Sequence, residues 1–132
     1  MPRPIRYALG MALSPQDLAA LDAAEEITIE TRANDGTPHQ TIIWVVVVAA
    51  GEGYVRSVRG ERGRWYREAQ ADPNVVIRVD GRAINVRAVP VTGQESISTV
   101  TAAIEEKYTG IPGLEPMLRP DVLDATLRLE SA

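Results

Sequence analysis

The chain has 132 residues and a formal net charge of −4, with 18 acidic against 14 basic side chains. It has no cysteine and one histidine, which excludes disulfides, thiolate metal sites and a metal site built from several histidines. The length fits a single domain over residues 1–132. The acidic balance argues against a general affinity for nucleic acid, and no apolar stretch is long enough for a membrane span, so we expect a cytoplasmic protein without a membrane partner.

The N-terminal part of the chain predicts an arm, a helix and a hairpin. Residues 1–12 show no clear period and are expected to form an N-terminal arm. Ser14, followed by proline, is typical of a helix start, and the helix is predicted to end near Ala24. The alternation over Glu26–Arg32 predicts a half-buried strand, and Asn34-Asp35-Gly36 predicts the hairpin turn after it.

The most apolar segment is Gln40–Ala50, which holds Trp44 and four successive valines. Antiparallel strands with one face in water alternate, whereas this run is apolar on both faces. We therefore predict a central strand, with Thr41–Val48 the most buried strand of the fold. Core packing is the favoured role for Trp44, with contact to a bound ring as the alternative. Tyr54–Arg59 then predicts a short strand with a polar face.

The second half of the chain alternates hairpin and helix signals. Arg64–Ala71 predicts a short helix that an Asp-Pro pair stops, and Glu95–Tyr108 has helical spacing. Val75–Val79 and Arg82–Val91, separated by Asp-Gly, predict a hairpin, and Ala125–Leu129 predicts a last strand. Antiparallel hairpins dominate, so the class is a β-barrel with packed helices or an α+β fold.

The segment from residue 54 to 67 is basic, although the chain as a whole is acidic. It holds one acid, Glu61, and five arginines, which are Arg56, Arg59, Arg62, Arg64 and Arg67. Guanidinium groups suit phosphate oxygens, and Ser57 adds a hydroxyl donor. Gly60 and Gly63 allow a close backbone approach, and a helix that begins near Gly63 aims free N–H groups at the same place. The segment therefore predicts a phosphate site.

Two other interpretations of the basic segment stay open. Arginine replaces lysine almost everywhere in the chain, since Lys107 is its one lysine, so the segment is also consistent with an ordinary solvated surface. A nucleic-acid site is a weaker third interpretation, because the patch is short and the rest of the composition is acidic.

A set of motifs occurs in a fixed order between Gln40 and Arg87. In chain order they are Ile43-Trp44-Val45, Arg56-Ser57, Arg59-Gly60, Gly63, Trp65-Tyr66, Ala71-Asp72-Pro73-Asn74-Val75 and Val86-Arg87-Ala88. With this set the chain resembles the flavin-binding split β-barrel superfamily, which includes pyridoxamine phosphate oxidase-like proteins and deazaflavin-dependent nitroreductases. The resemblance is greatest to a branch of unknown function in which Lys107-Tyr108 and Thr126-Leu127-Arg128-Leu129 recur.

The resemblance implies a mostly β (α+β) fold, an antiparallel split β-barrel of about six strands with two or three flanking helices. It also implies a deazaflavin coenzyme or FMN, with its phosphate on Arg56–Gly63, its ring along Thr41–Trp44, and the site at a homodimer interface. The cofactor-binding residues expected from pattern and resemblance together are Thr41, Ile43, Trp44, Arg56, Ser57, Arg59, Gly60, Arg62, Gly63 and Trp65. Glu68 departs from the asparagine that related enzymes often carry, and an acid there is expected to weaken phosphate binding.

Two hypotheses for the function follow. The first is a flavin-type oxidoreductase that acts on a small molecule by hydride transfer and needs no catalytic side chain, with a slight preference for deazaflavin. The second is a cofactor-free barrel dimer that serves as a ligand-binding or accessory protein. Trp65 and the tyrosines Tyr54, Tyr66 and Tyr108 are expected to pack. His39 follows a turn and is expected to be exposed, with catalysis as the less favoured role.

Overall fold

The structure is a computed structural model, and it describes residues 12–132. The predicted N-terminal arm lies outside the described residues, apart from its last residue. Seven strands form one antiparallel sheet: β1 Ile27–Arg32, β2 Pro38–Ile43, β3 Val46–Val48, β4 Glu52–Arg56, β5 Asn74–Val79, β6 Arg82–Pro90 and β7 Thr126–Ser131. The helices are α2 Pro15–Ala23, α3 Arg64–Ala71 and α4 Gln94–Lys107, with the short 3₁₀ segments η1 Gly60–Arg62, η2 Glu115–Leu118 and η3 Pro120–Val122.

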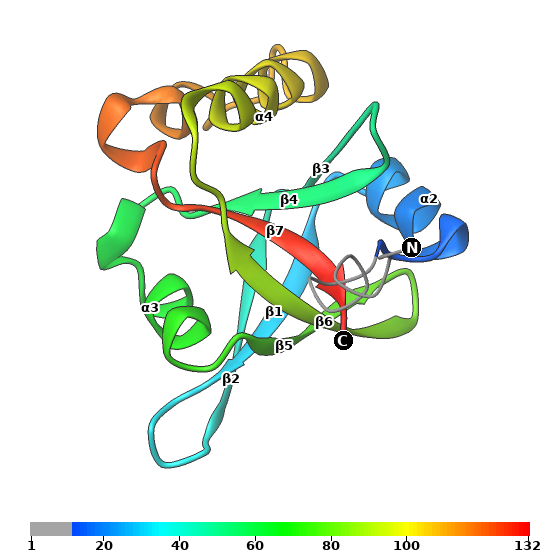
Figure 1. Cartoon of the computed structure of the whole chain (residues 1–132), viewed down its shortest axis with the longest axis vertical. Coiled ribbons are helices and arrows are strands. Elements are labelled where there is room, and N and C mark those ends of the chain that lie inside the picture. The colour runs from blue at the N-terminus through cyan, green and yellow to red at the C-terminus, as the bar shows by residue number, and fades with distance from the viewer. Residues whose placement is uncertain (1–11) are drawn as a thin grey trace, which may run out of the picture.

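The strand order is β2-β1-β5-β6-β7-β4-β3. β2 and β3 are neighbours in the sequence, yet they form the two opposite edges of the sheet. The sheet must therefore curl until its edges approach each other, and Figure 1 shows this curled sheet with α4 on its outer side. The split-barrel class predicted from the sequence is confirmed, with three α-helices in the described part of the chain.

Local signals in the sequence set several element boundaries. Ser14 caps α2, since its Oγ accepts a hydrogen bond from the N–H of Asp17 at 3.1 Å. Helix α3 spans the residues predicted for it. Asp80 and Gly81 both have positive φ, 49° and 74°, as a tight two-residue hairpin between β5 and β6 requires.

The prediction of one central strand over Thr41–Val48 is wrong. The run is divided into β2 and β3, which lie at the two edges, and this division also raises the strand count to seven. Of the two, β3 is the more buried: its Val46 and Val48 pack under α4, while the half-buried Val47 packs against the inner core. Ile42 of β2 is 67% exposed, so the continuous apolar pattern reflected two edge strands in different surroundings.

Side chains from the end of α4 stabilise the break between β2 and β3. The N–H of Val45 donates to the hydroxyl of Tyr108 at 3.1 Å, and its carbonyl accepts from Lys107 Nζ at 2.8 Å. Because the side chains satisfy both backbone groups, Val45 needs no strand partner. The two residues Trp44 and Val45 can then carry the chain from one edge of the sheet to the other.

Two apolar clusters hold the fold together. The inner cluster fills the curl of the sheet and includes Ile29, Ile77, Leu127 and Trp65 of α3. The outer cluster lies between α4 and the β3–β4 edge, and it includes Tyr54, Val100, Ile104, Tyr108 and Met117. Residues of both clusters, such as Trp65 of the inner one and Met117 of the outer one, line the pocket described below.

Candidate functional site

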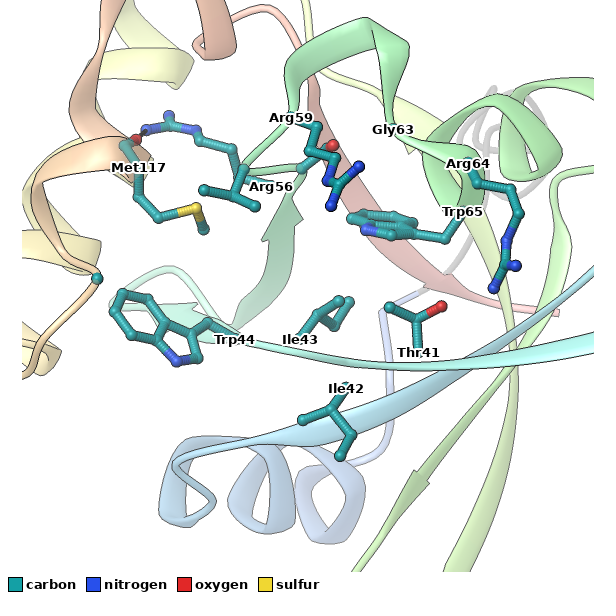
Figure 2. Close-up of a pocket in the computed structure, with 13 residues that line it drawn as sticks. Thr41, Ile42, Ile43, Trp44, Arg56, Arg59, Gly63, Arg64, Trp65 and Met117 are labelled. Atoms are coloured by element: carbon teal, nitrogen blue, oxygen red, sulfur yellow. Dashed lines mark hydrogen bonds between the residues drawn. The ribbon is translucent and has the colours of Figure 1, made fainter.

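A pocket of about 540 Å³ lies between the end of β2, the end of β4 and the start of α3. Its lining residues are Thr41, Ile42, Ile43, Trp44, Arg56, Ser57, Val58, Arg59, Gly63, Arg64, Trp65, Gly113 and Met117. The volume is within the range of small-molecule and cofactor sites. Figure 2 shows Arg59 and Trp65 facing Thr41 and Ile43 across the pocket, while Ile42 points away from it.

The pocket brings together eight of the ten residues that the sequence predicted as cofactor-binding. These are Thr41, Ile43, Trp44, Arg56, Ser57, Arg59, Gly63 and Trp65. Gly60 and Arg62 do not line it. The sequence analysis missed Ile42, Val58, Arg64, Gly113 and Met117 as lining residues. The position of Arg64 in the basic segment was a usable signal, whereas nothing in the sequence connects Gly113 and Met117 with residues so distant in the chain.

Gly60 has a role in packing. Its φ is +67°, and a Cβ there would lie 2.9 Å from the carbonyl oxygen of Asp121. The absence of a side chain therefore allows η1 to approach η3 closely. The close approach predicted for Gly60 is therefore one between two segments of the chain, rather than one between the backbone and a ligand.

Ser57 has a buried hydroxyl without a partner. The residue is 1% exposed, and its Oγ forms no hydrogen bond with any of residues 12–132. A buried hydroxyl that is left unpaired costs about 1–3 kcal/mol, so such a group calls for an explanation. The hydroxyl belongs to a pocket-lining residue, which makes a bound ligand a ready source of the missing partner.

Gly63 makes the space that this hydroxyl occupies. A Cβ at Gly63 would lie 2.5 Å from Ser57 Oγ, closer than real atoms approach. The backbone of Gly63 is ordinary, with φ −62° and ψ 138°, so the need for glycine here is steric. Ser57 and Gly63 thus form one unit, in which the glycine leaves the hydroxyl room at the start of α3.

The start of α3 adds further free donors. Gly63 is the N-cap of α3 and provides no side-chain cap, and the first intrahelical bond runs from the N–H of Arg67 to the carbonyl of Gly63 at 3.0 Å. The N–H groups of Arg64, Trp65 and Tyr66 therefore have no partner in the described part of the chain. Free N–H groups and the helix dipole favour an anion at this place.

Arg56 is a structural brace. It is 1% exposed, and its guanidinium donates to Thr126 Oγ1 at 2.8 Å, to the carbonyl of Met117 at 3.0 Å and to Thr101 Oγ1 at 3.0 Å. A fourth, longer bond of 3.4 Å reaches the carbonyl of Ile97. Burial lowers the pKa of Arg56 to about 10, because the charge lies among neutral acceptors. The guanidinium ties β4 to β7, α4 and η2, so most of its donors are occupied within the chain.

Arg59 and Arg64 are the free cations of the pocket. Both are exposed, and neither has a carboxylate partner within residues 12–132. They lie on the same side of the pocket as Ser57 and the start of α3. We call Ser57, Arg59, Gly63 and Arg64 the polar wall of the pocket.

The opposite side is apolar, and we call Ile43, Trp44, Gly113 and Met117 the apolar wall. The ring of Trp44 stacks on that of Tyr108, with centroids 3.9 Å apart and planes 3° from parallel. Gly113 has φ +102°, and a Cβ there would lie 3.6 Å from the Trp44 ring. Trp44 is half-buried, packs against the outer cluster and also lines the pocket, so packing is observed and contact with a bound ring stays a prediction.

Glu68 does not line the pocket, so the structure removes the basis for the expected weakening of phosphate binding. Its carboxylate accepts a hydrogen bond from Thr31 Oγ1 at 2.7 Å and lies 2.8 Å from Nδ1 of His39. Desolvation raises the pKa of Glu68, but the bonds from Thr31 and His39 outweigh it and the net shift is downward. His39 is partly buried, contrary to the expected exposure.

Within residues 12–132, no group of three or more histidine, cysteine or acidic side chains is arranged to hold a metal ion. None of the helices in that range is both long and apolar enough to cross a membrane.

The model of the family described as "Uncharacterized protein conserved in bacteria (DUF2255)" matches residues 17–129. The chain belongs to this family. Among curated proteins, none matches the sequence. The comparison with solved structures therefore provides the remaining likenesses of this DUF2255 member.

Three solved structures are similar in fold. HutZ, the heme storage protein from Vibrio cholerae, is 18% identical with a TM-score of 0.68, over 92% of this chain and 92% of that one. A candidate pyridoxamine 5′-phosphate oxidase from Listeria innocua is 15% identical with a TM-score of 0.63, over 86% and 89%. An F420-H2-dependent reductase is 18% identical with a TM-score of 0.62, over 80% and 94%. These likenesses confirm the split-barrel resemblance at the level of the fold.

Proposed function

We propose that the pocket binds a flavin-type nucleotide, either FMN or a deazaflavin coenzyme, and that the protein is an oxidoreductase acting on a small molecule. The observation that carries the proposal is the buried, unpaired hydroxyl of Ser57 at the uncapped start of α3. A phosphate there would accept hydrogen bonds from Ser57 Oγ and from the free N–H groups, and Arg59 and Arg64 would neutralise its charge.

The apolar wall suits the ring of such a nucleotide. Ile43 and Trp44 present an apolar surface beside the polar wall, and the stack on Tyr108 holds the Trp44 ring in place. When bound, the cofactor supplies the hydride chemistry, and the chain supplies binding, orientation and exclusion of water. The fold neighbours include an F420-H2-dependent reductase, which supports this class of ligand without deciding between the two cofactors.

A homodimer with the site at its interface is part of the proposal. The two large hydrophobic side chains that the described residues leave most exposed are Ile42 at 67% and Val58 at 49%; both residues are at the pocket, although the side chain of Ile42 points outward from β2. Ile42 lies on β2, which is an edge strand with one unpaired side. Pairing with a second copy would cover these apolar side chains. Light scattering at micromolar concentration should find a dimer, and a monomer would contradict this part.

Titration with FMN and with F420, followed by quenching of cofactor fluorescence, tests the proposed function. Ser57→Ala should weaken binding about tenfold while the apoprotein keeps or slightly gains stability, because the lost hydroxyl had no partner. Arg59→Ala should weaken binding by a similar factor, and more strongly at low salt. Arg62→Ala is the matched control, since Arg62 is also exposed but does not line the pocket.

The same titration separates the alternative function. A cofactor-free accessory dimer would bind neither nucleotide, would show no visible absorption after purification, and would gain no thermal stability on adding them. Equal affinities of the Ser57→Ala, Arg59→Ala and Arg62→Ala variants would place the ligand elsewhere.

A further inference from the structure

One polar network next to the pocket has no part in the proposed phosphate site. His39 lies on β2, two residues from Thr41, and the alternation along β2 puts His39, Thr41 and Ile43 on one face. The antiparallel register pairs Thr31 with His39, and it pairs Ile29 with Thr41. The face of β2 that carries pocket residues therefore continues directly to His39.

Three elements meet in this network. Glu68 of α3 accepts a hydrogen bond from Thr31 of β1 through one carboxylate oxygen, at 2.7 Å, and pairs with Nδ1 of His39 through the other, at 2.8 Å. Thr31 is 1% exposed, while the side chains of Glu68 and His39 are 13% and 29% exposed. The carboxylate is thus held at both oxygens, and the imidazole keeps an edge open to solvent.

The chemistry of the carboxylate sets the tautomer of the ring. An ionised carboxylate can only accept hydrogen bonds, so Nδ1 of His39 must carry the proton that it shares with Glu68. Nε2 is then the free nitrogen, and it has no hydrogen-bond partner in the described part of the chain. The other charged groups close to this pair are Asp35 of the β1–β2 turn and Arg64, whose charge helps to lower the pKa of Glu68.

The network lies beside one end of the pocket. Thr41 and Arg64 both line the pocket, His39 follows Thr41 on the same face of β2, and Glu68 follows Arg64 by one turn on α3. A ligand that extends past Thr41 and Arg64 along this face of β2 would come next to His39.

We propose that Nε2 of His39, when the imidazole is protonated, donates a hydrogen bond to the pocket ligand, while Glu68 and Thr31 act as positioning residues that fix the ring and its tautomer. This inference rests on the proposed function. The partner atom is an oxygen of the ligand, because the neighbouring Arg64 and a protonated imidazole both favour an electron-rich acceptor.

Two substitutions of His39 separate contact with the ligand from a structural role. His39→Asn puts an amide nitrogen near the position of Nδ1, so it can keep the bond to Glu68, but it has nothing at the position of Nε2. His39→Gln places its amide near the position of Nε2 and gives up the bond to Glu68. The affinity for whichever of FMN and F420 binds is then measured at about pH 5.5 and about pH 8.

The ratio of the wild-type affinity to the His39→Asn affinity should be about fivefold larger at about pH 5.5 than at about pH 8, because a charged donor makes the stronger bond. Titration of the phosphate itself is common to both proteins and cancels in this ratio. His39→Gln, whose amide N–H can donate at either pH, should recover part of the affinity at about pH 5.5 but none of the pH dependence. A His39→Asn variant with wild-type affinity at both pH values would show that His39 is structural, and would overturn the inference.

Nitrogen-15 NMR provides a second readout, and it is unambiguous because the chain has one histidine. Neutral His39 should carry its proton on Nδ1 in the wild type and lose that preference in Glu68→Ala, and the Nε2 resonance should move when the nucleotide is added. Binding without movement of Nε2 overturns this inference and leaves the proposed function intact. No binding of either nucleotide overturns both.

Discussion

The two walls of the pocket differ in how far their polar groups are satisfied within the chain. In the polar wall, the hydroxyl of Ser57, the N–H groups at the start of α3 and the guanidinium groups of Arg59 and Arg64 have no partner among residues 12–132. In the apolar wall, Trp44 is stacked on Tyr108, and the carbonyl of Met117 accepts from Arg56. The polar wall thus retains capacity to bind, while the apolar wall contributes stability.

Arg56 and Arg59 show most directly the difference between a polar group that is satisfied within the chain and one that remains free to bind. They lie three residues apart in the same basic segment, and the sequence gives them the same role. The structure buries Arg56 with four acceptors and leaves Arg59 exposed at the pocket. A substitution at Arg56 should therefore act on folding, and a substitution at Arg59 on ligand affinity.

The largest expected effect is that of Arg56→Met. The change leaves the carbonyl of Met117 and the hydroxyls of Thr101 and Thr126 without their donor, which should lower the free energy of unfolding by about 3 kcal/mol or more. Chemical denaturation of the apoprotein measures it. Arg62→Met is the control and should stay within about 0.5 kcal/mol. A stable Arg56→Met protein that had lost nucleotide affinity would instead restore Arg56 as a ligand residue.

Trp44→Ala should have the next largest effect. The change removes a half-buried ring that stacks on Tyr108, so the free energy of unfolding should fall by about 2–3 kcal/mol, less than for a fully buried tryptophan. Nucleotide affinity should also fall, because the apolar wall loses its largest surface. Tyr108→Phe keeps the stacked ring and removes the hydroxyl that binds Val45, so it separates stacking from support of the strand break. Unchanged stability of Trp44→Ala would show that the wall does not depend on the stack.

Gly63→Ala should cost roughly 1–3 kcal/mol of unfolding free energy, because its Cβ would meet Ser57 Oγ at 2.5 Å. The double variant with Ser57→Ala removes the atom that clashes and should recover most of the loss. The two changes should therefore be strongly non-additive in a double-mutant cycle measured by denaturation. Additive effects would mean that the hydroxyl moves aside freely and is not fixed by Gly63.

The smallest effect concerns Glu68 and acid. Its pKa is lowered in the folded protein, so ionised Glu68 contributes stability above the ordinary value of 4.5, and this contribution is lost as the pH falls through the folded-state pKa. Stability of the wild type should therefore decline on acidification more steeply than that of Glu68→Gln, by less than about 1 kcal/mol. Glu105→Gln, on the exposed side of α4, is the control. Parallel curves for wild type and Glu68→Gln would show that the pairing with Thr31 and His39 is weak.

Sequence reasoning succeeded where the determinants are local. Gly63 and the Asp-Pro pair after Ala71 bound α3, and Asp80-Gly81 form the β5–β6 turn, so these elements could be predicted from neighbouring residues. The polar wall also comes from one continuous segment. The burial of its unpaired Ser57 hydroxyl, and the way its N–H and guanidinium donors come together, depend on tertiary packing, which no pattern in that segment specifies.

Where the determinants are distant in the chain, prediction failed. The break at Trp44 and Val45 depends on Tyr108 and Lys107, more than sixty residues further along, and the run of valines carried no sign of it. In the same way, the acceptors of Arg56 come from α4, η2 and β7. Tertiary contacts of this kind override the local pattern.

The place of β7 in the sheet has a consequence for folding during synthesis. The strand comes last in the chain, yet it lies between β6 and β4 and carries the hydrogen bonds that join them. Until residues 126–131 leave the ribosome, β1, β2, β5 and β6 can pair with one another, but the β3–β4 hairpin has no strand to join. The end of β4, with Ser57 and the polar wall beyond it, is therefore fixed only after residues 126–131 have been synthesised.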